Sequence, residues 1–239
     1  MVQIDDCRSD FDIAAQLAVR LGLQELFWKD SHELLDEVLK PTGMTYAQFK
    51  EKAVISGATR YRKYEKDGFA TPSGKVEIYS DQLESWGFDP LPVYREPPET
   101  PASDPELAAK YPLVLTTGKS IYYLHSCGRQ IDSLRQGRPE PVVLIHPATA
   151  ARSAIGHGDW VYLETPRGRI KQKAILSEKV DPRVVCADFG WWFPEKGCAD
   201  LFGWADSNIN MLTDDQTQNG AETGSENLRG MLCSIKLVD

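Results

Sequence analysis

The sequence predicts an α+β fold in which a helical segment is followed by a closed, six-stranded β-barrel. Three observations carry this prediction. Residues 9–55 repeat apolar side chains at helical spacing between helix-capping residues. Residues 90–112 contain seven of the fifteen prolines. After them come six short runs rich in β-branched residues, and closing six strands into a barrel leaves no unpaired edge.

Three capping patterns define the helices of the first segment. Ser9-Asp-Phe-Asp12 resembles a capping box, Asp30 precedes a second amphipathic run, and Thr45 with Gln48 indicates a third helix start. Side-chain oxygens at such positions accept hydrogen bonds from backbone N–H groups that have no partner within the helix. The second helix is expected to bury Leu34, Leu35, Val38 and Leu39.

Two short elements are expected between these helices and the proline-rich stretch. Val76 and Ile78 alternate with polar neighbours, which predicts a half-buried strand. Residues 81–86 predict a short helix that ends at Gly87, because glycine commonly follows the last helical residue.

Proline sets the expected domain boundary. Because proline lacks a backbone N–H and fixes φ, residues 90–112 are expected to form a stiff surface linker without a regular helix or a central strand. The linker separates a mostly helical segment, 1–89, from a barrel domain, 113–239. The barrel strands are expected at 113–117, 142–146, 160–165, 169–177, 184–188 and 231–238.

One stretch of the barrel domain is predicted in more detail. Residues 145–161 follow the order strand, short helix, tight turn and strand, and Pro147 suits the first helical position. Asp159 is expected to close the glycine-containing turn by accepting a backbone hydrogen bond. A hairpin comes next, and Arg167 at its tip is expected to be a solvated turn residue.

Composition excludes several classes of protein. The net charge of −8 argues against general binding to nucleic acid or to anionic lipid. The five cysteines are odd in number and widely spaced, which argues against a disulfide framework, a zinc site or an iron–sulfur site made by this chain alone. The sequence contains no run of 18 apolar residues, so it predicts no transmembrane helix. The first residues lack the pattern of a signal peptide. The cytoplasm is therefore the default location, with the periplasm open through a signal on a missing portion or on a partner.

The first segment that resembles a ligand site consists of Thr116, Thr117, Gly118 and Lys119. These residues end a strand of buried type, so hydroxyls, backbone N–H groups and an ammonium are expected to face a phosphate or a pterin oxygen there. The alternative is an ordinary strand followed by a glycine turn.

The second segment is a loop that lacks the pattern of a strand or helix. It holds Tyr122, His125, Ser126 and Arg129, and loops with such polar and aromatic content often bind ligands. His125 offers a hydrogen bond to a ligand carbonyl, and Arg129 offers a partner for a phosphate. The alternative is a surface loop that its aromatic side chains hold in place.

The third segment carries two asparagines, Asn208 and Asn210. Each amide offers a donor and an acceptor, which suits the edge of a pterin or guanine ring, whereas local Asx turns are the competing explanation. Aromatic side chains at 190–195 and 202–204 precede this segment. They predict a satellite hydrophobic core in preference to a wall beside a planar cofactor.

The order of these segments resembles the closing domain of the molybdopterin oxidoreductases of the dimethyl sulfoxide reductase family. Residues 116–119 match the family's Thr-Thr-Gly-Arg-like turn, and His125 matches its His-bearing loop. Residues 146–150 and 156–159 match its Pro-x-x-Ala helix and Gly-x-Gly-Asp turn, and 210–213 match its Asn-x-Leu-Thr. Lysine stands at 119 where arginine is commoner, so a cation is kept but bidentate pairing is lost.

The resemblance covers nearly the whole chain. Segments 8–11, 40–41, 71–77 and 91–98 are similar to the part of the family that precedes the closing domain. The Gly-Trp-Trp-Phe-Pro-Glu and Ser-Asn-Ile-Asn segments look most similar to the branch that contains thiosulfate or polysulfide reductases and acetylene hydratase.

The resemblance implies a double-psi β-barrel that binds molybdopterin guanine dinucleotide carrying molybdenum or tungsten. It implies the C-terminal part of an oxidoreductase of anaerobic respiration, without the metal ligand or the iron–sulfur site and inactive alone. The expected partner is the remainder of the catalytic subunit or a separate catalytic chain. Two rival hypotheses stay open: a cofactor-free protein-interaction module, and a self-processing decarboxylase that cuts Gly224-Ser225.

Overall fold

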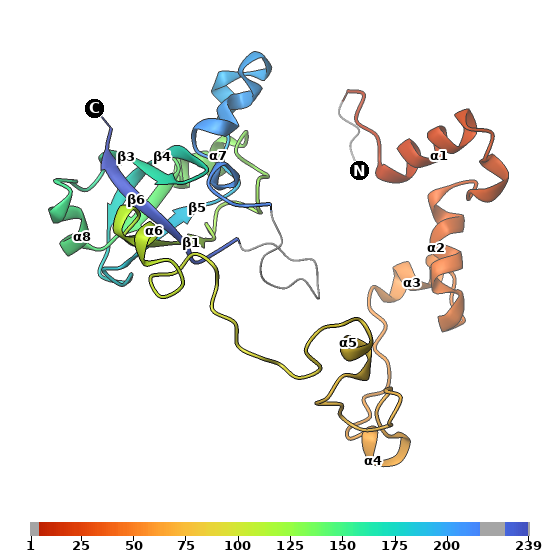
Figure 1. The fold of residues 1–239 in the computed structure, drawn as a ribbon. Coiled ribbons are helices and arrows are strands. Elements are labelled where there is room, and N and C mark those ends of the chain that lie inside the picture. Colours follow the sequence, from red (N-terminus) through yellow and green to blue (C-terminus); the bar gives the residue numbers. More distant parts are fainter. Residues whose placement is uncertain (1–4, 216–227, 239) are drawn as a thin grey trace. The chain divides into compact units, whose positions relative to one another are not determined.

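The computed structural model describes residues 5–215 and 228–238, which fall into two compact units, Met1–Val76 and Glu77–Asp239 (Figure 1). Among residues 5–76, the regular elements of the first unit are all helical, and the second unit contains the barrel. This α+β arrangement, with helices first and a closed six-stranded barrel after them, confirms the predicted fold class.

The helices of the first unit begin where the sequence predicts. Ser9 caps α1, Asp30 caps α2 with two backbone hydrogen bonds, and Thr45 forms a full capping box with Gln48 before α3. These caps satisfy N–H groups that the first helical turn leaves without a partner. The helices are α1 (Asp10–Arg20), α2 (Ser31–Leu39), α3 (Tyr46–Lys52) and α4 (Tyr64–Asp67), with 3₁₀ turns η1 (Gln24–Leu26) and η2 (Lys40–Thr42).

The apolar faces of these helices are largely exposed. Among the described residues of the first unit, only Ala18 is buried. Leu34, Leu35 and Leu39 are half-buried, but Val38 is 63% exposed, so its expected burial is wrong. Helical periodicity tells which side chains share a face, and it does not tell what covers that face.

Two expectations for the stretch before the barrel are corrected. Val76 and Ile78 lie outside any strand, and Ile78 is 74% exposed. A two-fold alternation over so few residues does not form a strand when no neighbouring strand pairs with it. The proline-rich stretch contains a helix, α6 (Pro105–Lys110), since Pro105 takes the first helical position and Asp104 caps the helix. The expected short helix before the prolines is confirmed as α5 (Asp81–Ser85).

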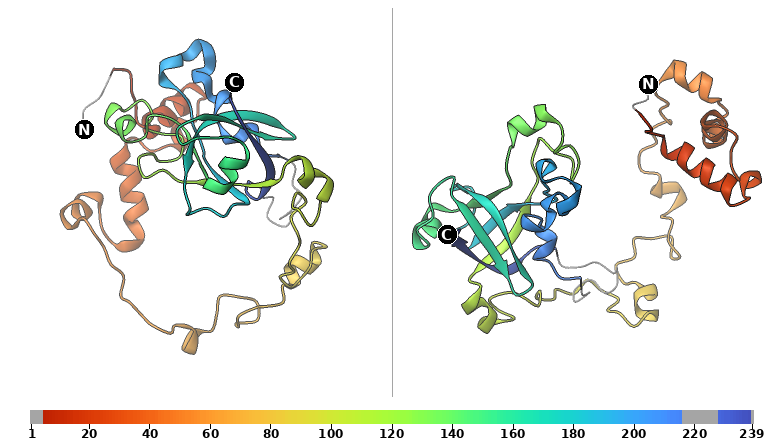
Figure 2. Two further views of the ribbon diagram at one scale, coloured as in Figure 1. Left: turned by 90° about the vertical axis from the view of Figure 1, so that its left-hand side faces the viewer. Right: turned by 90° about the horizontal axis from the view of Figure 1, so that it is seen from above.

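The barrel closes in the order β1-β5-β2-β4-β3-β6. β1 pairs in parallel with β5, and β2 pairs in parallel with β4; the other four pairings are antiparallel. Figure 2 shows β6, in dark blue, lying across the barrel beside β3. The strands are β1 (Leu113–Gly118), β2 (Val142–Ile145), β3 (Trp160–Thr165), β4 (Gly168–Leu176), β5 (Val184–Asp188) and β6 (Met231–Leu237).

The strand, helix, turn and strand order of residues 145–161 is confirmed. α8 (Pro147–Arg152) follows β2 and starts with Pro147, and the ring of His146 caps it by accepting from the Ala148 N–H. The Asp159 carboxylate accepts a 2.7 Å hydrogen bond from the Gly156 N–H, which closes the turn before β3 as expected. Another short helix, α7 (Asp132–Gly137), lies between β1 and β2.

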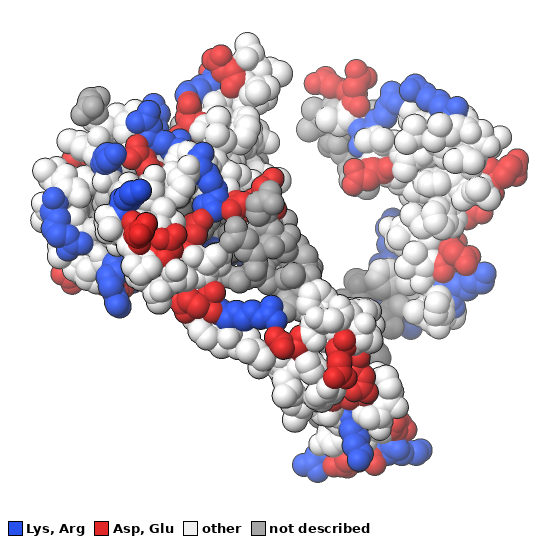
Figure 3. Space-filling view, viewed as in Figure 1, with Lys and Arg blue, Asp and Glu red and all other residues white. Residues whose placement is uncertain are grey.

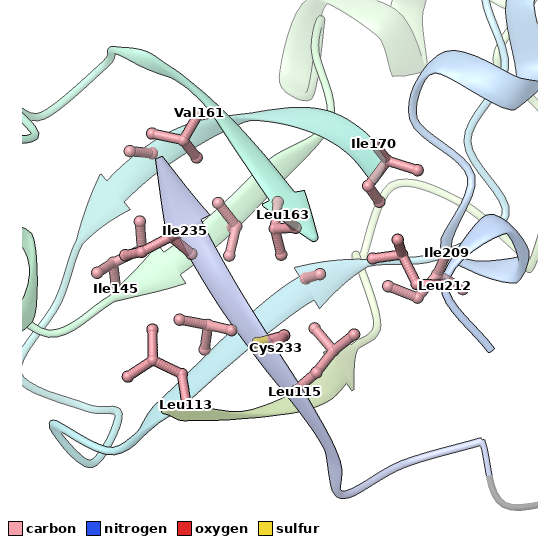
Figure 4. Packing of buried hydrophobic residues seen from close by; sticks show 14 of the residues in the cluster. Leu113, Leu115, Ile145, Val161, Leu163, Ile170, Ile209, Leu212, Cys233 and Ile235 are labelled. Atoms are coloured by element: carbon pink, nitrogen blue, oxygen red, sulfur yellow. The ribbon is translucent and has the colours of Figure 1, made fainter. Parts of the chain in front are cut away.

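The barrel interior holds the hydrophobic core, to which all six strands contribute. Leu115, Leu163 and Ile170 point into it and are almost completely buried (Figure 4). Two members of the same core, Ile209 and Leu212, come from a segment outside the strands and lie at one end of the barrel. Burying side chains of this size is worth about 1.5–3 kcal/mol each. That gain ties segment 209–212 to the barrel.

Arg167 corrects a further expectation, because it is not a solvated turn residue. Its guanidinium binds both carboxylate oxygens of Glu99 and also contacts Asp214 at 2.6 Å. All three side chains are less than a quarter exposed. The two acidic partners lie 68 and 47 residues away in the sequence, so the hairpin tip alone does not reveal them.

Basic and acidic side chains are interspersed over the face of the barrel in view (Figure 3). Within the described ranges, no helix has the length and apolarity that a membrane span needs. The same ranges contain no group of three or more His, Cys, Asp or Glu side chains placed to hold a metal ion.

Candidate functional site

The register of three strands gathers polar residues at one end of the barrel. β1 and β5 run in parallel with Gly118 opposite Asp188, so the residues that follow them, Lys119 and Phe189, emerge side by side. β6 runs antiparallel to β1 with Met231 opposite Leu115, so Arg229, two residues before it, enters at the same end. The carboxyl ends of parallel strands are a common place for ligand sites.

A fourth segment, the 3₁₀ turn η5 (Ile209–Met211), is tied to this end by buried polar side chains. The Thr165 hydroxyl donates to the Leu212 carbonyl at 3.0 Å. The fully buried Gln172 amide donates to the carbonyls of Asp188 (2.8 Å) and Ser207 (3.2 Å), and its oxygen accepts from the Asp188 N–H at 3.1 Å. Gln172 therefore connects the end of β5 to the segment that leads into η5.

These segments enclose a pocket of about 270 Å³. Four of the residues expected from the sequence meet in it, and they come from β1, the loop after it and η5. Lys119 is one of these four, and Arg229 adds a second cationic side chain, whereas none of the described lining residues is acidic. The pocket is lined by Thr117, Lys119, His125, Phe189, Ile209, Asn210, Thr213, Leu228 and Arg229.

The ring of His125 stands at the edge of this pocket on a strained backbone. His125 has φ of +52°, which L-residues rarely adopt, and its ring meets Phe189 edge to face with centroids 5.9 Å apart. The side chain is exposed, so both ring nitrogens are available to a ligand at the pocket mouth. Asn210 is also exposed there, while its backbone N–H is held by the Asn208 side chain at 3.0 Å.

Four other expected site residues lie next to the pocket without lining it. Thr116 and Gly118 lie on β1, and a Cβ at Gly118 would come within 2.9 Å of the Cys186 sulfur, so a larger residue there would force the Cys186 side chain to shift. The Ser126 carbonyl accepts from the Trp192 indole N–H at 2.6 Å. Asn208 caps η5, as in the Asx-turn explanation.

Tyr122 belongs to a different hollow. It lines an open groove of about 560 Å³ together with Ile121, Leu124, Ile131 and other residues of the same loop. This groove is mostly apolar, and Ile121 is 92% exposed beside it.

Arg129 corrects the expectation that it pairs directly with a phosphate. Its side chain is 2% exposed and lies inside the loop, where the guanidinium donates to the carbonyls of His125 and Phe189. A buried guanidinium with these partners does not face the pocket. The loop sequence contains Arg129 and Tyr123, but it does not show that Trp191, 62 residues later, covers the same guanidinium.

The aromatic cluster forms the satellite core that the sequence favours. Trp191 is fully buried and packs edge to face against Tyr123 and Phe193. Trp192 packs in the same manner against Phe202. The cluster supports the loop after β1 and is absent from the described lining of the 270 Å³ pocket.

Sequence reasoning missed Phe189 and Arg229 as site residues. Phe189 directly follows an expected strand, and Arg229 lies two residues before another. Both residues lie next to the ends of strands that pair with β1. This relation becomes visible only once the strand order is known. Thr213 had been noticed in the Asn-x-Leu-Thr motif but had not been assigned to the site.

Asp188, which directly precedes the lining residue Phe189, has a buried carboxylate with a shifted pKa. Its carboxylate is buried, accepts from the Val142 N–H at 3.1 Å and lies 3.7 Å from the Arg138 guanidinium. Burial raises the pKa of Asp188, and the nearby Arg138 opposes that rise. The folded protein therefore holds this proton more tightly than the unfolded chain does.

We expect Asp188→Asn to change the pH dependence of stability. The wild-type penalty for a buried charge is present above the raised native pKa and disappears as the pH falls toward the unfolded value of about 3.9. Asparagine keeps an acceptor for Val142 without a charge. The variant's advantage in unfolding free energy should be largest at neutral pH and vanish near pH 4 in urea titrations; an advantage that grows as the pH falls would contradict this.

Comparison with known proteins agrees with the geometry. Residues 113–227 match the family described as "Molydopterin dinucleotide binding domain". Acetylene hydratase of Syntrophotalea acetylenica is 38% identical over 94% of this chain and 32% of that protein. Dopamine dehydroxylase of Eggerthella lenta is 41% identical over 71% of the chain and 17% of its own length. The dimethyl sulfoxide/trimethylamine N-oxide reductase of Cereibacter sphaeroides is 30% identical over 87% of this chain and 28% of its own length.

The solved structure of acetylene hydratase from Pelobacter acetylenicus matches with a TM-score of 0.88 at 38% identity, over 97% of this chain and 33% of that one. The chain belongs to the dimethyl sulfoxide reductase family. It corresponds to a C-terminal portion of a molybdopterin oxidoreductase and spans about a third or less of the length of these relatives. The description of the matched family, a domain that binds molybdopterin dinucleotide, agrees with the class of cofactor that the resemblance implies.

Proposed function

We propose that this chain binds molybdopterin guanine dinucleotide through the pocket at the carboxyl ends of β1 and β5. One observation carries the proposal: Thr117, Lys119, His125 and Asn210, expected from three separate sequence segments, line a common pocket. The resemblance to the family does not by itself require these residues to meet, because the three segments that carry them are separated by up to 93 positions in the chain, from Thr117 to Asn210. Their meeting supports a shared ligand.

The donor set fits part of this cofactor. Lys119 and Arg229 offer cations for the diphosphate, and the Asn210 amide and His125 ring offer donors and acceptors for the edge of a ring. Phe189 and Ile209 add apolar surface for a flat ring system. About 270 Å³ lies at the lower end of ligand-pocket sizes, so the pocket accommodates one ring with adjoining phosphate, and the rest of the cofactor extends beyond it.

The division of work follows from this donor set. The bound cofactor and its metal supply the redox chemistry, while the residues of this chain bind and orient the organic part. In this proposal the metal ligand and the iron–sulfur site lie in the remainder of the catalytic subunit or in a separate catalytic chain. The larger size of the relatives supports that arrangement.

The test measures binding by the full chain. Titration with purified molybdopterin guanine dinucleotide, and with GDP as its stable nucleotide half, is expected to show saturable binding by calorimetry. Asn210→Ala should weaken it about tenfold, the value of one good hydrogen bond to a ligand. His32→Ala, in the first unit, is the control and should bind like wild type. Lack of binding by the wild-type chain, or equal losses in both variants, would contradict the proposal.

A second candidate is a protein-interaction module without cofactor, and the apolar groove beside Tyr122 favours it. The same titration separates the two, because a pure interaction module has no reason to bind GDP through Asn210. The third hypothesis, cleavage at Gly224-Ser225, concerns residues that lie outside the described ranges. Mass spectrometry of the purified chain tests it directly, since cleavage yields two fragments.

A further inference from the structure

The guanidinium of Arg129 lies against two aromatic rings that themselves meet edge to face, with centroids 5.6 Å apart and an interplanar angle of 87°. Its central carbon is 4.4 Å from the ring centroid of Tyr123 and 4.9 Å from that of Trp191. Trp191 is fully buried, and Arg129 is 2% exposed. A guanidinium held in the corner of such a pair is attracted to both rings, and its burial leaves it little room to move.

The fixed guanidinium joins two walls of the cofactor pocket. Its Nη1 donates to the His125 carbonyl at 2.7 Å, and its Nη2 donates to the Phe189 carbonyl at 3.2 Å. Both acceptor residues line the pocket, one from the loop after β1 and the other from the end of β5. Gly190 permits the approach: its φ is +65°, and a Cβ there would lie 3.3 Å from the His125 carbonyl carbon.

The arrangement is poorly explained by stability alone. Burial lowers the pKa of Arg129, because the charged form loses solvation, and its buried Nε has no hydrogen-bond partner. Replacing a buried charge of this kind by an apolar side chain of similar size is often neutral for stability or stabilising. A long apolar residue packed against the same two rings would fill this space and would lack only the hydrogen bonds to the two carbonyls.

We propose that Arg129 is a positioning residue that sets the spacing of His125 and Phe189 and thereby the affinity of the pocket for the nucleotide, without touching the ligand. This inference rests on the proposed cofactor site. It predicts that substitutions at position 129 change the affinity for the nucleotide without a matching change in the stability of the fold. Arginine is required because its planar fork reaches two carbonyls at once, whereas a lysine ammonium at the same place reaches them only in turn.

Arg135 is a matched control in the same cluster. Its guanidinium lies 5.7 Å from the same Trp191 ring, but its hydrogen bonds go to the Glu195 carboxylate at 2.9 and 3.1 Å. Like Arg129, it has one buried nitrogen without a partner, Nη1. It therefore shares the aromatic setting of Arg129 and lacks the bonds to the pocket walls.

The test compares Arg129→Met, Arg129→Lys and Arg135→Met in the full chain by GDP titration and by thermal unfolding. Arg129→Met is expected to weaken GDP binding at least tenfold with Tm within a few degrees of wild type. Arg129→Lys should bind GDP with an affinity between those of the wild type and Arg129→Met. Loss of packing alone does not predict such a partial rescue. Arg135→Met should bind GDP as tightly as the wild type does.

Two outcomes overturn the inference. One is wild-type affinity in Arg129→Lys or Arg129→Met at unchanged Tm. The other is an equal loss in Arg135→Met, which would assign the effect to the aromatic cluster as a whole. If Arg129→Met fails to fold, the lysine variant alone decides. Asn210→Ala separates failure of the proposed binding site from failure of the proposed role of Arg129. Normal GDP binding by Asn210→Ala contradicts the binding site itself. Weakened binding by Asn210→Ala, together with normal binding by both Arg129 variants, contradicts only the role of Arg129.

Discussion

Reversing both cations of the pocket, Lys119→Glu together with Arg229→Glu, is expected to abolish nucleotide binding. Each charge-assisted hydrogen bond to a phosphate is worth about 1.5–3 kcal/mol. Loss of two such bonds weakens binding by a factor of about 10²–10⁴, and the new negative charges add repulsion. Because the described lining holds no acidic residue, these two side chains set the sign of the potential that an incoming diphosphate meets.

The control for this variant changes the net charge equally at a distance from the pocket. Lys63→Glu with Lys179→Glu alters two exposed lysines that do not line it. Calorimetry with GDP at low and moderate salt should show a steep salt dependence for wild type and for the control. Similar affinities in the pocket variant and the control variant would mean that net charge, and not this pocket, governs binding.

Gln172→Ala is expected to cause the largest loss of stability among single polar substitutions in the barrel domain. The wild-type amide satisfies three buried backbone groups, the N–H and C=O of Asp188 and the C=O of Ser207. Each group left buried without a partner costs about 1–3 kcal/mol. We therefore expect a loss of about 3 kcal/mol or more, which lowers Tm by roughly 10 °C in a domain of this size.

The same substitution should weaken GDP binding, because Gln172 connects the segment that precedes Phe189 to the segment that leads into η5. Gln130→Ala, at an exposed position, is the matched control for losing a glutamine side chain. Thermal unfolding followed by circular dichroism measures both. An unchanged Tm in Gln172→Ala would show that water or a neighbouring group satisfies the three backbone atoms in the variant.

Local patterns in the sequence predicted local structure well. Ser9, Asp30 and Thr45 cap helices as expected, because capping depends on atoms within three residues of the cap. The six strands were found for a similar reason, since a run of β-branched residues defines a strand wherever its partners are. Val76 and Ile78 show the limit: their alternation is genuine, but no strand lies beside them in the fold.

The site was predictable to the extent that its residues lie in motifs next to strands. Lys119, His125 and Asn210 were found in that way. Arg129 and Arg167 were assigned wrong surroundings, because their partners lie 47 to 68 residues away and depend on the strand order. Long-range hydrogen bonds of this kind cannot be read from the neighbourhood of one arginine.

The pairing of β6 has a consequence for how the protein is made. β6 lies between β1 and β3, so these two strands have no common neighbour until residues 231–237 are in place. On the ribosome, β1 emerges more than a hundred residues before the strand that completes its pairing. Until β6 has been made, β1 and β3 each have one edge without a partner strand, and open edges of this kind are prone to pair with other chains.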